Sequence, residues 1–127
     1  MQYLLTIWME EATPDFVPTP EMMAPWAVFN NEAAEAGVLR GGSGLQHSTT
    51  ATTVRGGGEV VLTDGPFMET KEQLAGYYVV DCADLDEAIA WAKKVPAVSW
   101  GAAIELRPVI GETDAAVNRD ASGAAAS

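Results

Sequence analysis

The amino-acid sequence predicts a single α+β domain in which strands and helices follow one another along most of the chain. Short apolar runs are bounded by glycine, proline and aspartate, which is typical of strands, and two stretches carry apolar residues at helical spacings. A chain of 127 residues with 48% apolar composition is long enough for one hydrophobic core. We expect this domain over residues 1–110, followed by a disordered tail (111–127) that lacks apolar periodicity.

The first strand is expected over residues 2–9, where apolar side chains occupy both faces. A helix should follow, because residues 19–21 (Thr-Pro-Glu) have the form of an N-cap, a first-turn proline and an acidic first turn. Gly37 is placed to end this helix, and Pro25 could delay its regular part by removing a backbone hydrogen bond. The predicted apolar stripe consists of Met22, Trp26, Phe29, Ala33 and Ala36.

The middle of the chain predicts a glycine-interrupted strand over residues 38–45 and then a β-hairpin. Residues 51–55 and 59–63 are β-prone and flank three glycines, which places Arg55 opposite Glu59 if the glycines form the loop. After the turn at residues 64–67, the spacing of residues 70–73 is that of a capping box and predicts about one helical turn.

The last third predicts a strand (75–82), a helix that begins after Asp84 and ends near Pro96, and a final strand (101–107). The resulting order matches a ferredoxin-like split β-α-β sandwich with an inserted hairpin. Two helices cover only one face of such a sheet, whereas the first strand is apolar on both sides. We therefore expect a homodimer that buries the second face.

The charge of the chain disfavours nucleic-acid and membrane-surface binding. Seven basic residues stand against 18 acidic ones, a formal net charge of −11 that repels phosphate backbones and anionic lipids. A small molecule, a basic protein surface or a second copy are the expected partners. The lone Cys82 cannot form an internal disulfide and fits a reducing, cytoplasmic compartment with a buried, inert thiol. The apolar N-terminal run lacks the features of a signal peptide and is too short to span a bilayer.

Residues 51–78, ATTVRGGGEVVLTDGPFMETKEQLAGYY, resemble the DGPF (YCII-related) family, whose hallmark TDGPFxETKEQLxGFY corresponds to residues 63–78. The resemblance extends from Met1 to about Val109. It implies a bacterial, cytoplasmic protein of dimeric α/β-barrel type with a pocket near the subunit interface. Relatives include an enzyme that dechlorinates a hydroxylated aromatic, with a proposed histidine-aspartate active site. Members also tend to be encoded beside extracytoplasmic-function sigma factors, which implies a regulatory role and a sigma-factor-related partner.

Asp64 is the first candidate catalytic residue. The expected hairpin pairing places Asp64 on the same face as Val54, Val60 and Leu62, where partial desolvation would favour its neutral form and suit it to proton transfer. Alternatively, Asp64 bonds the backbone of its own Asp-Gly-Pro turn.

The other candidates also have structural alternatives. Histidine is the side chain whose unperturbed pKa lies near neutrality, so His47 could act as an acid or base, or it could be a solvated loop residue. Arg55 could bind an anionic substrate bidentately or pair across the hairpin with Glu59. Trp8 and Phe67 are candidate substrate-binding aromatics, although large apolar side chains more often pack in a core.

Two functional hypotheses remain open from the sequence. The first is a small-molecule enzyme that uses Asp64 as general acid or base, helped by His47 and Arg55. The second is a non-catalytic module that senses a ligand or presents its acidic surface to a basic, transcription-related protein. The sequence contains no phosphate loop, dinucleotide fingerprint, nucleophile elbow or zinc-ligand cluster, so we expect neither a cofactor nor a metal site.

Overall fold

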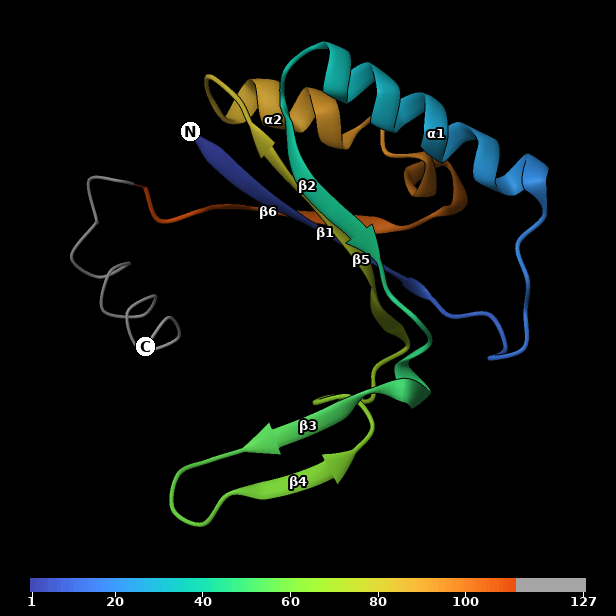
Figure 1. The fold of residues 1–127 in the computed structure, drawn as a ribbon, viewed down its shortest axis with the longest axis vertical. Helices are drawn as coiled ribbons and strands as arrows, with labels where there is room; N and C mark the ends of the chain where they lie inside the picture. Colours follow the sequence, from blue (N-terminus) through green and yellow to red (C-terminus); the bar gives the residue numbers. More distant parts are fainter. Residues whose placement is uncertain (112–127) are drawn as a thin grey trace.

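The computed structural model describes residues 1–111, which form an antiparallel four-stranded sheet, two helices and a separate two-stranded hairpin (Figure 1). The sheet order is β2-β5-β1-β6, so α1 and α2 connect strands in a split β-α-β arrangement, as expected for an α+β, ferredoxin-like fold. The elements are β1 (Gln2–Glu10), α1 (Pro20–Glu35), β2 (Leu39–Gly44), β3 (Thr52–Arg55), β4 (Val61–Asp64), β5 (Glu72–Asp81), α2 (Leu85–Ala92) and β6 (Ala103–Pro108). The expected tail lies outside the described residues from residue 112 onward.

The hydrophobic core lies between the sheet and the helices. Alternate residues of β1, namely Tyr3, Leu5 and Ile7, are buried there, because successive side chains of a strand point to opposite faces. Phe29 of α1 packs against the same cluster. Cys82 is buried in this core as predicted, and burial raises the pKa of its thiol. No helix within residues 1–111 is both long enough and apolar enough to cross a membrane.

Helix α1 begins where its capping signal predicts. The Thr19 hydroxyl accepts the Met22 N–H at 3.3 Å, and Gly37 follows the C-cap with φ +75°. The suspected delay at Pro25 is wrong, because the helix runs through it from Pro20. Pro25 is inside the helix, and its missing N–H removes one intrahelical hydrogen bond without ending the helix. The apolar stripe is buried only at Phe29 and Ala33.

Helix α2 confirms the second capping prediction, with the Asp84 carboxylate accepting the Glu87 N–H at 2.9 Å. A short 3-10 turn, Pro96–Trp100, follows this helix and was not predicted. It ends at Gly101 with φ +89°, and β6 then runs alongside β1. The final strand therefore begins two residues later than expected.

The hairpin forms, but its predicted register is wrong by two residues. Arg55 pairs with Val61 and Thr52 with Asp64, so the loop contains residues 56–60 and not only the three glycines. Two glycines of this loop adopt positive φ, which allows a wider turn than the sequence count suggested. A shift of two preserves the side-chain parity, so Asp64 still shares a face with Val54 and Leu62.

The helical turn predicted for residues 70–73 is wrong, because β5 already begins at Glu72. The reciprocal bonds of a capping box are not made: the Thr70 hydroxyl donates to the Glu72 carbonyl, and the Gln73 side-chain amide donates to the Thr70 carbonyl at 3.2 Å. Gln73 also donates to the Met68 carbonyl at 3.0 Å. The motif therefore shapes the loop that precedes β5 and does not start a helix.

Two apolar surfaces lack cover within residues 1–111. One is the sheet face opposite the helices, here called the open face, which carries Leu4, Trp8, Tyr77 and Val79. The other is the hairpin of residues 52–64, here called the arm, which projects from the sheet on the side away from both helices (Figure 1). Val54 and Leu62 on the arm are 64% and 68% exposed.

Candidate functional site

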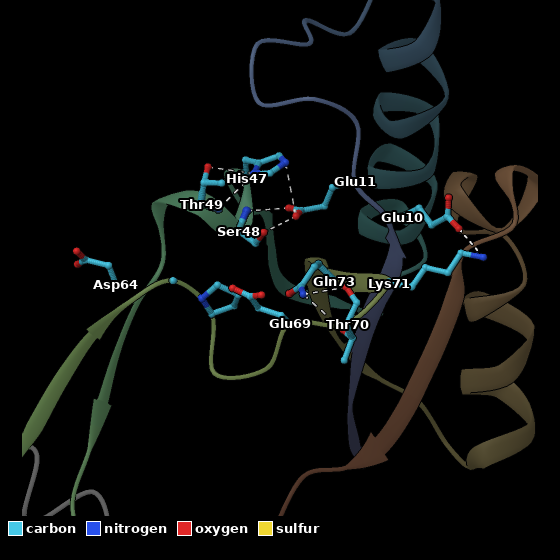
Figure 2. Close-up of a pocket in the computed structure, with 12 residues that line it drawn as sticks. Glu10, Glu11, His47, Ser48, Thr49, Asp64, Glu69, Thr70, Lys71 and Gln73 are labelled. Atoms are coloured by element: carbon cyan, nitrogen blue, oxygen red, sulfur yellow. Dashed lines mark hydrogen bonds and ion pairs between the residues drawn. The ribbon is translucent and has the colours of Figure 1, made fainter.

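A polar pocket of about 660 Å³ lies where the base of the arm meets the ends of β1 and β5. The upper wall in Figure 2 contains Glu11, His47 and Ser48, and the lower wall contains Glu69 and Thr70. Both predicted catalytic residues, Asp64 and His47, line this pocket. Residues distant in sequence therefore meet here because β1 and β5 are neighbours in the sheet.

The side chain of His47 is held by protein groups on both ring nitrogens. Thr49 donates its backbone N–H to Nδ1 at 3.2 Å, and Nε2 lies 3.0 Å from the Ala12 carbonyl oxygen. The Glu11 carboxylate lies 3.6 Å from Nε2 and accepts both the N–H and the hydroxyl of Ser48. His47 is thus a partly buried residue whose two ring nitrogens both contact protein groups.

Asp64 lies at the outer edge of the pocket with its carboxylate directed away from the other labelled residues (Figure 2). Its side chain is exposed, which corrects the expectation that the apolar hairpin face would desolvate it. The turn after Asp64 is held by other groups: Gly65 donates its N–H to the Ala51 carbonyl, and the Thr53 hydroxyl donates to the Gly65 carbonyl. Within residues 1–111 the Asp64 carboxylate has no hydrogen-bond or ion-pair partner.

The right side of the pocket in Figure 2 is closed by Lys71 and Gln73. Lys71 forms an ion pair with Glu10 at 2.9 Å, and the hydrogen bond and charge of Glu10 raise the pKa of Lys71. This ammonium therefore stays protonated and is already engaged. The pocket wall holds four carboxylates, from Glu10, Glu11, Asp64 and Glu69, against this one lysine.

An apolar hollow of about 1060 Å³ adjoins the polar pocket and extends over one end of the open face. Its apolar walls include Trp8, Phe67, Met68 and Leu74. The Trp8 indole N–H already donates to the Thr6 hydroxyl at 2.9 Å, so the ring offers only its apolar surface. The residues that line both cavities are His47, Ser48, Pro66, Thr70, Lys71 and Gln73.

Arg55 is the one predicted site residue that lines neither cavity. Its guanidinium carbon lies 4.8 Å from the centre of the Phe67 ring, a cation–π contact that joins the arm to the wall of the hollow. The predicted cross-strand pair with Glu59 does not form in this register. Arg55 therefore supports Phe67 in this structure.

The sequence reasoning missed Glu11 and Gln73. Both are polar residues at the ends of the neighbouring central strands β1 and β5, and that position was the available signal. The described residues contain no group of three or more histidine, cysteine, aspartate or glutamate side chains arranged to hold a metal ion.

The comparisons with known proteins agree with the motif in residues 63–78. A family model, the YCII-related domain, matches residues 1–112. The uncharacterized protein R00369 of Rhizobium meliloti (strain 1021) is 44% identical over 73 residues, which are 57% of this chain. The match spans 59% of that relative's own length. Because the family model covers nearly all of the described fold, the chain belongs to the YCII-related domain family.

Proposed function

We propose that this protein is an enzyme that acts on a small amphipathic molecule, with Asp64 as the general acid or base. The observation that carries the proposal is the Asp64 carboxylate, which lines a pocket and has no partner within residues 1–111. An exposed side chain changes rotamer within picoseconds to nanoseconds, so the outward direction seen in Figure 2 does not prevent Asp64 from reaching a ligand.

The two adjoining cavities support an amphipathic ligand. The apolar hollow beside Trp8 and Phe67 would take the apolar body, while the carboxylate-rich pocket would take a polar end that donates hydrogen bonds, such as an amine or hydroxyl. An anionic end would meet four carboxylates, and the pocket's only lysine is tied to Glu10. The ligand class therefore follows from the charges of the walls.

The Asp64→Asn variant tests this proposal because it keeps the shape of the side chain and removes its charge and its acid-base capacity. We use benzylamine and benzoate as matched probes and follow the Trp8 indole N–H signal by NMR. Benzylamine should shift this signal and benzoate should not. Asp64→Asn should weaken benzylamine binding about two- to fivefold, the effect of about 0.5–1 kcal/mol expected for an exposed ion pair.

The control is Glu35→Gln, which removes the same charge from an exposed position of α1 outside both cavities. It should leave benzylamine binding unchanged. Urea denaturation of Asp64→Asn should match the wild type, because no protein group loses a bond. A loss of stability of 1–3 kcal/mol with unchanged binding would instead assign Asp64 to the turn.

A non-catalytic ligand sensor is the second candidate, and the engagement of both His47 nitrogens favours it. With both nitrogens in contact with protein groups, His47 is not placed to exchange a proton with Asp64. A sensor would bind the probe as the enzyme does. However, once a converted substrate is known, Asp64→Asn should lower turnover on the order of 10²-fold if the protein is an enzyme.

A further inference from the structure

The ring of His47 lies between two loops that meet above the polar pocket. It caps the 3-10 turn Ser48–Thr50, and its side chain is 22% exposed. On one side it contacts Thr49, which precedes the arm, and on the other it contacts Ala12, in the connection between β1 and α1. A single side chain thus joins two segments that are 35 residues apart in sequence.

The hydrogen bonds determine where the imidazole proton lies. The Thr49 backbone N–H lies 3.2 Å from Nδ1, and the Thr49 hydroxyl oxygen lies 3.0 Å from the same nitrogen. Because a backbone N–H can only donate, we infer that Nδ1 is the acceptor and that the hydroxyl also donates to it. A backbone carbonyl can only accept, so Nε2 must donate to Ala12. Both contacts require the same neutral tautomer, with the proton on Nε2, and they leave neither nitrogen for a ligand.

Glu11 completes the connection between the loops. Its carboxylate accepts the Ser48 N–H at 2.7 Å and the Ser48 hydroxyl, and it faces the edge of the ring that carries Nε2. Figure 2 shows these residues together on one wall, whereas the carboxylate of Asp64 is directed away from them. The carboxylate beside His47 is therefore Glu11 and not Asp64, and the Ser48 N–H and hydroxyl hold it there.

We propose that His47 is a positioning residue, and that its Nε2-protonated ring clamps the β1–α1 connection, which carries Glu11, against the base of the arm. This inference rests on the proposed function, because the clamped wall is the one that would receive the polar end of the ligand. In this role His47 maintains the shape of the site, and a carboxylate carries out any proton transfer. An acid-base role would require the ring to release Thr49 or Ala12 first.

The tautomer can be measured without a ligand. The chain has one histidine, so ¹⁵N NMR of the wild-type imidazole at about pH 8, above the unperturbed histidine pKa of about 6.5, reports His47 alone. We expect the proton on Nε2 and slow hydrogen exchange at the Thr49 amide. A proton on Nδ1, or an even mixture of tautomers, would overturn the clamp.

Replacing His47 by glutamine distinguishes a positioning role from a role in proton transfer. Glutamine can place its amide nitrogen near the Nε2 position and donate to Ala12, but it cannot act as an acid or base near neutral pH. His47→Gln should keep benzylamine binding within about threefold of the wild type, whereas His47→Ala should weaken it tenfold or more and speed exchange at the Thr49 amide. Equal losses in the two variants would contradict the positioning role.

The two proposals fail in different ways. If benzylamine does not bind the wild type, the proposed function is wrong, while the tautomer and the exchange rates still decide the clamp. If benzylamine binds and the ring carries its proton on Nδ1, the clamp is wrong and the ligand proposal stands.

Discussion

Gly76→Ala should lower the free energy of unfolding by about 2–3 kcal/mol, at the upper end of the cost of overpacking a core. Gly76 is buried in β5, and a Cβ atom there would lie 2.8 Å from the Ser43 carbonyl oxygen and 3.2 Å from the Gly44 Cα. Both neighbours are backbone atoms of β2, so the strand itself must move. Urea denaturation monitored by tryptophan fluorescence measures the change.

Gly44→Ala is the matched control, because Gly44 pairs with Gly76 across the same ladder and a Cβ added to it meets nothing within 4 Å. Neither glycine needs a positive φ, so the variants differ in space and not in backbone strain. We expect Gly44→Ala to change stability by less than about 0.5 kcal/mol. Comparable losses in the two variants would show that the close approach of β2 and β5 is not the cause.

Val79→Glu should convert a dimer into a monomer. We propose that two copies associate through the open face, where Val79 lies between Leu4 and Gly41 and no described helix covers it. A single copy leaves this face only partly buried and the apolar arm exposed. A glutamate in such an interface would cost several kcal/mol as an unpaired buried charge. Light scattering at micromolar concentration measures the mass, which should be twice that of the chain for the wild type.

The distribution of charge also supports a second copy as the occupant of this face. The chain carries a net charge of −11, yet Leu4, Trp8, Tyr77 and Val79 are neutral. Glu105 and Arg107 of β6 lie on this face as well, opposite Thr6 and Leu4, and their charges are paired with each other at 2.9 Å. The control is Val28→Glu on α1, 64% exposed on the opposite layer, which should stay dimeric. A monomeric wild type, or a dimeric Val79→Glu, would contradict the proposal.

The candidate site was only partly predictable from the sequence. Candidate residues could be selected from the sequence by the chemical properties of their side chains. Four of them, Asp64, His47, Trp8 and Phe67, line the two adjoining cavities. Their roles could not be chosen in this way. Whether Nε2 of His47 can bind a ligand depends on its contact with the Ala12 carbonyl, 35 residues away. Asp64 is exposed because the arm projects away from the rest of the domain (Figure 1).

The sequence by itself determined the order of the strands and the two α-helices, the caps of both helices, the family and the face of the hairpin on which Asp64 lies. These features depend on neighbours in the chain or on side-chain parity. Only the tertiary structure decided the hairpin register, the loss of a helical turn at residues 70–73 and the contacts that His47 makes with Ala12 and Thr49. Each of these depends on contacts that the sheet brings together. The pairing of β1 with β5, for example, makes residues 70–73 lead directly into a central strand, so tertiary pairing overrode the local capping signal.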